Sequence, residues 1–234
     1  MTYDCWNTLL RDASGTEAQV LRRKSLRRLL GCSDGEAQSL LQEGWARHDR
    51  EWRAIRAFGP GGIAEWCARS YGIDNADVIA ELTAEFEAAS LAVGVEAVAG
   101  SREVLEALAA AGIRRGLVCD TGFTPGHLVR QLLARVDLLD LLEVCAFSDE
   151  VGLPKPAAET FHAALDPLAV SPADAVHVGD LRRTDVAGAQ AIGMRAARFR
   201  GEHDDGSAGP EGDWVLDRHG DLLAHLGIPA ERAG

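Results

Sequence analysis

The run Gly116-Leu-Val-Cys-Asp-Thr-Gly122 places a short apolar segment directly before an acidic, hydroxyl-bearing turn. The same order recurs at Ala175-Val-His-Val-Gly-Asp180, where an apolar run again ends in a carboxylate. Short apolar runs bounded by turn residues are typical of fully buried strands. Both stretches therefore predict parallel strands that carry polar side chains at their carboxyl ends.

Working outward from these stretches, short apolar runs alternate with segments of helical periodicity. The expected strands are residues 1–3 at most, 116–119, 144–147, 175–178, 195–199 and, at the edge, 214–216. The expected helices include 128–133, roughly 157–165, 186–192 and 222–226, and the acidic, Gly-rich segment 201–213 is predicted to be a mobile loop. Such alternation predicts an α/β fold with a doubly wound, Rossmann-like parallel sheet.

Residues 16–93 have a different texture, since helical stripes follow one another without a strand pattern. We therefore expect an α-helical domain inserted near the start of the core. The predicted division is 14–95 for the helical domain, and 1–13 with 96–234 for the Rossmann-like core.

Composition argues against several functional classes. Lys and Arg number 24 against 36 Asp and Glu, a net charge of −12, so no nucleic-acid partner is expected. Apolar runs end well before the ~18 residues that span a bilayer, and the first residues lack a signal-peptide pattern. We predict a soluble, cytoplasmic protein without membrane contact, either a monomer or a homodimer. The five cysteines are widely spread without a CxxC pair, which favours reduced thiols.

Polar residues follow the predicted strands in a pattern that suggests chemistry. They are Asp4, Asp120, Thr121, Lys155, Asp180 and Asp185. The carboxyl ends of parallel strands share one edge of the sheet, so we expect these side chains to meet in one crevice. Closely packed carboxylates repel one another unless a cation lies among them, and hard oxygen ligands suit Mg²⁺. Such a site beside a lysine would hold a phosphoryl group.

Four stretches, in order, resemble the motifs of the haloacid dehalogenase-like hydrolase superfamily. They are Tyr3-Asp-Cys-Trp-Asn-Thr-Leu-Leu10, Val118-Cys-Asp-Thr-Gly122, Ser148-Asp-Glu-Val-Gly-Leu-Pro-Lys-Pro156 and His177-Val-Gly-Asp-Leu-Arg-Arg-Thr-Asp185. The resemblance covers almost the whole chain, and the helical insertion lies where the family carries its cap domain. It implies a hydrolase whose substrate is a small phosphorylated or otherwise anionic metabolite.

The resemblance also implies a role for each matched residue. Asp4 would be the nucleophile, forming an aspartyl-phosphate that water then hydrolyses. The cofactor Mg²⁺ would be held by the Asp4 carboxylate, the backbone carbonyl of Trp6 and Asp180, with Asp185 binding directly or through water. Lys155 would be catalytic and phosphate-binding, because it offsets negative charge on Asp4 and on the phosphoryl oxygens.

Two positions depart from the family's pattern. Trp6 stands two residues after the nucleophile, where the family's phosphatases carry an aspartic general acid. An indole N–H only donates hydrogen bonds, and losing general acid–base help costs roughly 10²- to 10⁴-fold in rate. Cys119 occupies the usual Ser/Thr place under a strict alignment. Thr121 is then a second candidate for the phosphate-binding hydroxyl. Asp120, which stands where the family often has Asn, is also expected to bind the substrate or its phosphate.

Three functions therefore stay open. The combination of Asp4, Lys155 and Asp180 favours a Mg²⁺-dependent phosphatase. The aromatic Trp6 keeps open a 2-haloacid dehalogenase-type hydrolysis through an Asp4 ester, although family dehalogenases tend not to keep the Gly179-Asp180 pair. The missing general acid keeps open a catalytically weakened protein that binds a phosphorylated ligand.

Other residues have both a structural and a functional interpretation. Three tryptophans are predicted to pack in the core of the helical domain rather than stack on substrate, namely Trp45, Trp52 and Trp66. His48 is expected to be a packed or interface histidine. Most charges of the basic run 21–30 are expected to face solvent, with Arg22 on the leucine side as the exception considered for substrate contact. Arg182 and Arg183 are expected either to pair with carboxylates or to reach an anion.

Overall fold

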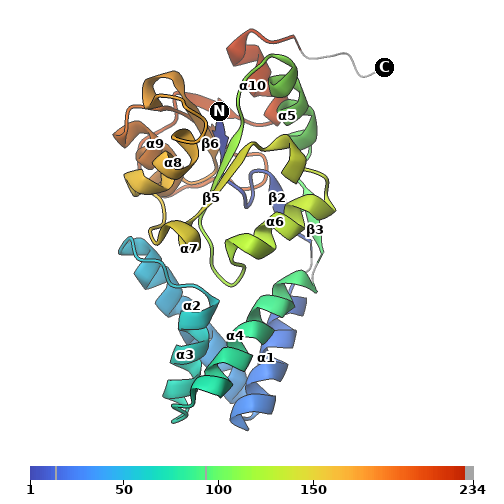
Figure 1. Ribbon diagram of the computed structural model, residues 1–234, viewed down its shortest axis with the longest axis vertical. Coiled ribbons are helices and arrows are strands. Elements are labelled where there is room, and N and C mark those ends of the chain that lie inside the picture. The colour runs from blue at the N-terminus through green and yellow to red at the C-terminus, as the bar shows by residue number, and fades with distance from the viewer. Residues whose placement is uncertain (14, 93, 230–234) are drawn as a thin grey trace.

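The computed structural model describes residues 1–13, 15–92 and 94–229. An α/β core occupies one end of the molecule, and helices α1 to α4 project from it at the other end (Figure 1). The two groups are joined by the chain segments that carry strands β2 and β3. The helices thus stand together as an insertion, as the sequence pattern indicates.

Within the described residues, the main sheet has 6 strands in the order β5-β4-β1-β6-β7-β8. They are β1 (Thr2–Tyr3), β4 (Gly116–Cys119), β5 (Val144–Phe147), β6 (Val176–Gly179), β7 (Arg195–Phe199) and β8 (Trp214–Leu216). All pair in parallel, and β1 lies between β4 and β6, with Thr2 opposite Gly116 on one side and His177 on the other. The strand order reverses beside β1, so the predicted doubly wound, Rossmann-like sheet is confirmed.

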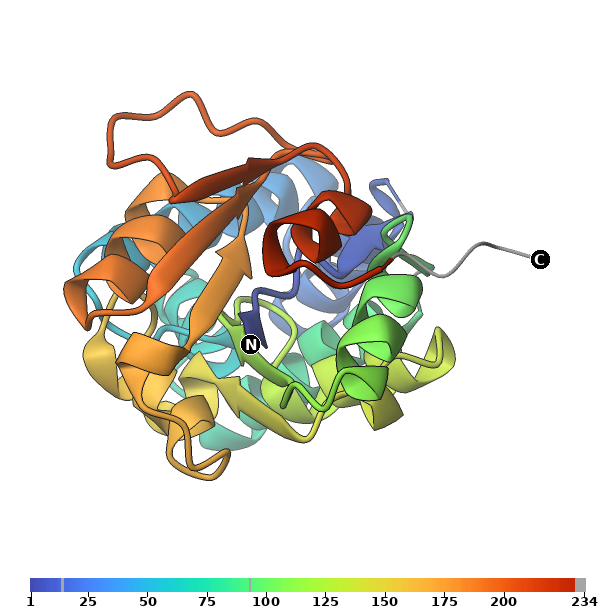
Figure 2. The ribbon, with the colours of Figure 1, turned by 90° about the horizontal axis from the view of Figure 1, so that it is seen from above.

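Helices cover both faces of this sheet (Figure 2). The core helices are α5 (Ser101–Ala110), α6 (Gly126–Arg135), α7 (Ser148–Val151), α8 (Ala158–Leu165), α9 (Ala187–Ala191) and α10 (His219–Leu226). Short 3₁₀ turns lie at Leu139–Leu141 and Pro172–Asp174, and a π-helical turn at Arg182–Val186 precedes α9. Leu105, Val129 and Leu222 belong to one buried cluster, whereas Phe161 and Ala189 belong to another. The sheet is therefore the middle of three layers.

The helical insertion, defined here as α1 to α4, has its own hydrophobic core. Its helices are α1 (Glu17–Leu30), α2 (Asp34–Arg53), α3 (Pro60–Ser70) and α4 (Ala76–Leu91). Ser33 and Asn75 accept backbone hydrogen bonds at the starts of α2 and α4, as preferred helix N-caps do. Leu26, Ile63 and Phe86 lie in one fully buried cluster, so the apolar stripes face one another.

The insertion is attached through a pair of strands that the sequence pattern does not predict. Strand β2 (Leu10–Asp12) pairs antiparallel with β3 (Val95–Ala97), so the two connections run side by side. Each strand has 3 residues, which is too short for an alternating pattern to be recognised.

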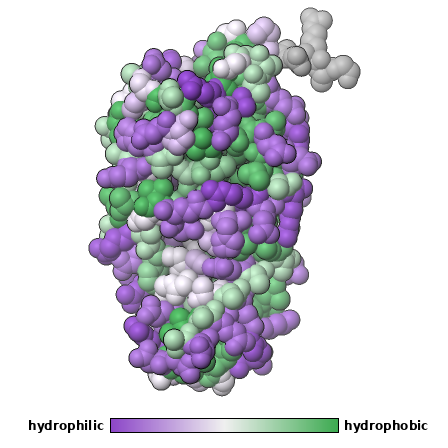
Figure 3. Space-filling model, in the orientation of Figure 1, coloured by the Kyte–Doolittle hydropathy of each residue, from purple (hydrophilic) through white to green (hydrophobic). Residues whose placement is uncertain are grey.

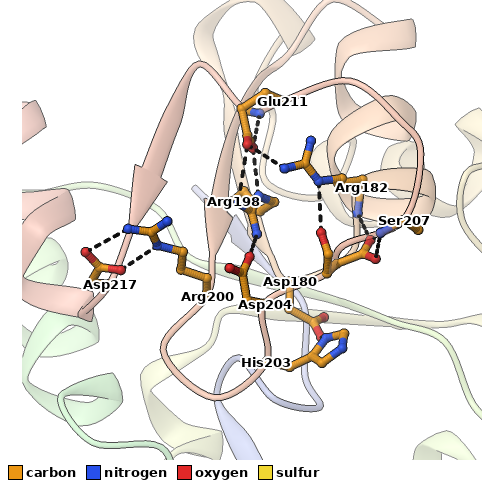
Figure 4. A network of polar contacts seen from close by, with 11 residues as sticks. Asp180, Arg182, Arg198, Arg200, His203, Asp204, Ser207, Glu211 and Asp217 are labelled. Atoms are coloured by element: carbon orange, nitrogen blue, oxygen red, sulfur yellow. Dashed lines mark hydrogen bonds and ion pairs between the residues drawn. The ribbon is translucent and has the colours of Figure 1, made fainter.

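The irregular segment 200–213 is tied to the core by polar contacts (Figure 4). Arg198 of β7 is buried and pairs with Asp204 at 2.6 Å and with Glu211 at 2.7 Å. Asp205 accepts hydrogen bonds from the backbone N–H groups of Arg182 and Ser207. The segment is irregular, as predicted. Its ion pairs and hydrogen bonds attach it to β7 and to the π-helical turn, which does not fit the expectation of a mobile loop.

Hydrophilic and hydrophobic residues are intermixed over the core and the insertion on the face seen in Figure 3. Among the described residues, no helix combines the length and apolar character needed to cross a membrane. Every cysteine lies within the described ranges and is a free thiol, as predicted.

Candidate active site

The carboxyl ends of the strands open into a cavity of about 230 Å³, called here the carboxylate cavity. Asp4, Asp120 and Asp180 directly follow β1, β4 and β6. They line the cavity together with Lys155 and with Asp185 of the π-helical turn. Of the site residues predicted from the sequence, Thr121 lies elsewhere.

Local backbone geometry explains why Asp4 and Asp185 can point into the cavity. The backbone N–H of Asp4 donates to the carbonyl of Val178, which extends the pairing of β1 with β6 by one residue. The chain then turns sharply through Asn7, whose φ of 56° lies in the left-handed region that Asn tolerates. A Cβ at Gly179 would lie 2.3 Å from Cγ of Asp185, so only glycine lets that carboxylate approach β6.

Lys155 is the central cation of the site. Its Nζ donates to Oδ1 of Asp4 at 2.5 Å and to Oδ1 of Asp185 at 2.7 Å, and the side chain is almost completely buried. Oδ1 of Asp185 also accepts from Nε2 of His177 at 3.0 Å, while the Thr2 hydroxyl lies 2.9 Å from Nδ1 of the same ring. A buried chain of hydrogen bonds therefore fixes the carboxylate that positions the lysine.

The pKa values of the carboxyl groups reflect their burial first and an excess of negative charge second. Burial raises the pKa of Asp4 to about 7, because the attraction of Lys155 only partly offsets desolvation. Burial, with repulsion from Asp4 and Asp185, raises the pKa of Asp180 to about 8. Burial alone would raise the pKa of Asp185, but Lys155 and His177 hold it well below its usual value. The lysine thus balances Asp185 and leaves the other two carboxylates short of positive charge.

The donor set fits Mg²⁺. Asp4, Asp180 and Asp185 are all buried, and each offers a carboxylate oxygen within 4.8 Å of the others. Hard oxygen ligands are those that Mg²⁺ prefers, and a cation there would offset the burial and the repulsion that raise the pKa values of Asp4 and Asp180. Trp6 also lines the carboxylate cavity, and metal binding by its backbone carbonyl stays a prediction.

Asp120 connects the core to the helical insertion. Its Oδ1 accepts from the backbone N–H of Lys155 at 2.8 Å, and its Oδ2 accepts from Nε1 of Trp52 at 2.7 Å. Burial raises the pKa of Asp120, although Lys155 opposes the shift. Trp52 comes from the end of α2, and the guanidinium of Arg183 lies 3.9 Å from its ring centroid. The prediction that Trp52 packs inside the insertion is wrong, because a helical stripe does not reveal which neighbour covers it.

The two candidates for the second-motif role lie outside the lining of the carboxylate cavity. The Thr121 hydroxyl lies 3.0 Å from the hydroxyl of Ser148, and Thr121 lines the adjoining cavity described next. Cys119 is fully buried at the end of β4, and a hydrogen bond with Cys5 together with burial raises the pKa of its thiol well above the usual value. Phosphate binding by Thr121 therefore stays a prediction.

A second cavity of about 360 Å³, called here the aromatic cavity, lies between the insertion and the core. Its lining includes Trp6, Trp45, Trp52, Phe123 and Arg22. Arg22 is only 4% exposed, donates to the Ser90 hydroxyl at 2.7 Å and lies 4.1 Å over the Phe123 ring. Burial lowers the pKa of Arg22 to about 10, although Asp12 acts in the opposite direction. Arg22, the residue of the basic run 21–30 considered for substrate contact, therefore lines the aromatic cavity.

The remaining tryptophans differ from one another. Trp45 is 47% exposed and stacks on His48 at 4.5 Å and on Phe123 at 5.4 Å, so its predicted place in the hydrophobic core is wrong. His48 is buried beside the aromatic cavity, as expected of an interface histidine. Trp66 packs against the buried cluster of the insertion, as predicted.

Sequence reasoning missed His203. Its Nδ1 lies 3.2 Å from Oδ2 of Asp180, and it lines the carboxylate cavity from the irregular segment 200–213 (Figure 4). No periodic pattern marks a residue in such a segment, so only the folded chain reveals the contact. Arg182 pairs with Glu211 at 2.8 Å, which is the carboxylate pairing of the two alternatives expected for it (Figure 4).

Comparison with known proteins finds curated relatives that match part of this chain. Over 105 residues the chain is 32% identical to the glyceraldehyde 3-phosphate phosphatase of Pyrococcus furiosus, covering 44% of this chain and 42% of that protein. Over 129 residues it is 31% identical to the phosphoglycolate phosphatase of Salmonella paratyphi A, covering 54% of this chain and 50% of that protein. The chain thus spans about half the length of these curated relatives.

The fold is shared with a 2-haloacid dehalogenase from Pseudomonas syringae. The two structures superpose with a TM-score of 0.73 at 22% identity, covering 97% of this chain and 96% of that chain. A sequence model of the haloacid dehalogenase-like hydrolase family matches residues 2–193, which include Asp4, Asp120, Lys155, Asp180 and Asp185. With this match and the strand-end site, the chain belongs to the haloacid dehalogenase-like hydrolases.

Proposed function

We propose that this protein is a Mg²⁺-dependent phosphatase of a small phosphorylated metabolite, with Asp4 as its nucleophile. The observation that carries the proposal is the contact of buried Lys155 with both Asp4 and Asp185, beside Asp180 in one cavity. Relatives named for glyceraldehyde 3-phosphate and phosphoglycolate support the substrate class. Residues 14–95 would form the cap domain, with 1–13 and 96–234 as the catalytic core.

In this proposal, an Asp4 carboxylate oxygen attacks phosphorus in line and the bond to the leaving oxygen breaks, giving an aspartyl-phosphate. Water then attacks phosphorus, releases phosphate and restores the carboxylate. Lys155 offsets charge on the phosphoryl oxygens, and Asp185, held by His177, fixes the lysine. Mg²⁺ bound by Asp4, Asp180, Asp185 and the Trp6 carbonyl would supply the positive charge that attracts a phosphoryl dianion.

Dehalogenation is the second candidate, since Trp6 lines both cavities where the family's phosphatases carry an acid. The buried cluster of Asp4, Asp180 and Asp185 favours phosphoryl transfer, because ester formation at carbon needs no cation. Chloride release from 2-chloropropionate in the presence of chelator would reverse this order.

The test is phosphate release from p-nitrophenyl phosphate by the full chain, with Mg²⁺, with EDTA and with the isosteric Asp4→Asn variant. We expect turnover that needs both Mg²⁺ and Asp4, with a loss on the order of 10⁴-fold or more in the variant. Asp74→Asn is the matched control, because Asp74 is exposed, pairs with Arg69 at 3.2 Å and lines neither cavity. Equal turnover by Asp4→Asn would contradict the proposal. Stabilisation by inorganic phosphate without turnover would instead indicate a binding protein.

A further inference from the structure

The proposed reaction needs a proton for the leaving oxygen. The residue two positions after the nucleophile, which supplies this proton in the family's phosphatases, is Trp6 in this chain and cannot do so. Trp6 stands where an aspartic acid would donate, and an indole N–H does not ionise at neutral pH. A phosphatase acting on alkyl phosphates without a general acid would lose roughly 10²- to 10⁴-fold in rate. Another residue at the point of bond cleavage would remove this deficit.

The two cavities show where bond cleavage would occur. Among the described residues, those that line both the carboxylate cavity and the aromatic cavity are Trp6, Trp52 and Asp120. A substrate with its phosphoryl group beside Asp4 and its organic part in the aromatic cavity would place its bridging oxygen at this shared wall. The two tryptophans cannot transfer a proton there, whereas a carboxylic acid can.

We propose that Asp120 is the proton donor to the leaving group, the catalytic role that Trp6 cannot perform. This inference rests on the phosphatase function proposed above. The carboxyl of Asp120 would give its proton to the leaving oxygen as the phosphorus–oxygen bond breaks, releasing an alcohol. The resulting carboxylate would take a proton from the water that attacks the aspartyl-phosphate, which restores the carboxyl and frees phosphate.

The contacts of Asp120 suit this role. The hydrogen bonds from the Lys155 backbone and from Trp52 reach different carboxyl oxygens, at 2.8 Å and 2.7 Å, so the group has one fixed orientation. Each oxygen has two lone pairs and therefore keeps one for the transferable proton. Burial favours the protonated form and raises the pKa of Asp120, although the charge of Lys155 and the two hydrogen bonds act in the opposite direction.

Each of the other acids and bases near the reaction path lines only one of the two cavities. His48 and Asp49 line the aromatic cavity alone, and His203 lines the carboxylate cavity alone. Asp49 also pairs with Arg53 at 2.8 Å on the α2 surface. Asp49→Asn is therefore a matched control, since it removes a carboxylate from the substrate side without touching the wall.

The experiment compares phenyl phosphate with p-nitrophenyl phosphate, two substrates of similar shape. Phenol has a pKa of about 10, like tyrosine, and needs protonation as it leaves, whereas the nitro group stabilises nitrophenolate as an anion. We expect Asp120→Asn to lower kcat on phenyl phosphate by about 10²-fold or more and kcat on p-nitrophenyl phosphate by less than about tenfold. Asp49→Asn should leave the ratio of the two rates unchanged.

Trp52→Phe separates proton donation from a merely structural contact. This variant removes the indole hydrogen bond to Asp120 but keeps the carboxyl, so it should preserve the ratio of the two rates. Equal losses on both substrates in Asp120→Asn, or the same change of ratio in Trp52→Phe, would overturn the assignment of Asp120 while leaving the phosphatase proposal intact. Absence of turnover of either aryl phosphate by the unmodified protein would contradict both proposals.

Discussion

The carboxylate cavity and the aromatic cavity share three lining residues but are otherwise lined by different kinds of side chain. The first is lined by ionisable groups from strand ends and their loops, with Lys155 among Asp4, Asp180 and Asp185. The second is lined by rings from the insertion and from the loop after β4, with buried Arg22 among them. The two buried cations differ in the same way, since Lys155 contacts carboxylates whereas Arg22 donates to Ser90 and Phe86 and lies over an aromatic face.

Because their linings differ, the two cavities should respond differently to substitution. A buried ion cluster depends on exact partners, because each unpaired charge retains its desolvation penalty. Aromatic contacts are individually weak and tolerate rearrangement more easily. We therefore expect changes in the carboxylate cavity to alter rate and stability together, and changes in the aromatic cavity to alter substrate affinity.

The largest effect is expected for Lys155→Met, which removes the central cation but keeps much of the side-chain volume. Asp4 and Asp185 would remain buried without their partner, so the free energy of unfolding at pH 8 should fall by about 3–5 kcal/mol. Phosphate release should fall to the background of Asp4→Asn. Urea denaturation and the p-nitrophenyl phosphate assay measure the two effects, and unchanged stability would contradict the charge balance described for this cavity.

A pH effect of nearly this size is expected beneath the loop that carries Asp4. His219 is fully buried, donates from Nε2 to the carbonyl of Thr8 at 2.8 Å and stacks on Phe199. Burial lowers the pKa of His219 to about 4, against 6.5 in the unfolded chain. Between these values the unfolded chain binds the extra proton, so the contribution of His219 to stability should be complete above pH 6.5 and fall by about 3 kcal/mol as the pH drops to 4.

The measurement for His219 is urea denaturation across pH 4–7 with His219→Gln as the control. Relative to the unmodified protein, the glutamine variant should gain about 3 kcal/mol in free energy of unfolding between pH 7 and pH 4, because glutamine keeps a donor but does not titrate, whereas Asp4 and Asp180 titrate in both proteins. Parallel curves for the two proteins would show that other groups carry the acid sensitivity.

In the aromatic cavity, Arg22→Met should act on affinity. The guanidinium of Arg22 is a buried cation in the lining of the aromatic cavity. A hydrogen bond from such a charged group to the substrate would contribute about 1.5–3 kcal/mol. We expect KM for phosphoglycolate, which carries a second anionic group, to rise by about tenfold or more. KM and kcat for p-nitrophenyl phosphate should change little. An unchanged KM for phosphoglycolate would mean that Arg22 only packs against Phe123.

The smallest effect is expected for Trp45→Ala. Trp45 is about half exposed and contributes ring contacts with His48 and Phe123 at the cavity rim. Loss of these contacts should lower the free energy of unfolding by about 0.5–1 kcal/mol, with kcat unchanged. Thermal denaturation and the aryl phosphate assay provide the measurements, and a loss as large as that of Lys155→Met would remove the distinction between the cavities.

The order of elements and the strand-end residues of the core were predictable from the sequence alone. Short apolar runs that end in Asp120 and Asp180 specify strands and their exits, because burial on both faces demands continuous apolar residues. Parallel strands place those exits at one edge, so the meeting of Asp4, Lys155, Asp180 and Asp185 follows from local patterns. The independent helical insertion also followed from periodicity.

Contacts between distant segments were decided by the tertiary structure. Strands β2 and β3 are too short to show a pattern and exist because they pair with each other. Trp52 and His203 reach the site from a helix end and an irregular loop, where sequence periodicity carries no information about the neighbour. Periodicity states which face is covered, whereas the partner that covers it depends on how the insertion docks on the core. For that physical reason, Asp120 is identified at the shared wall only once the chain is folded.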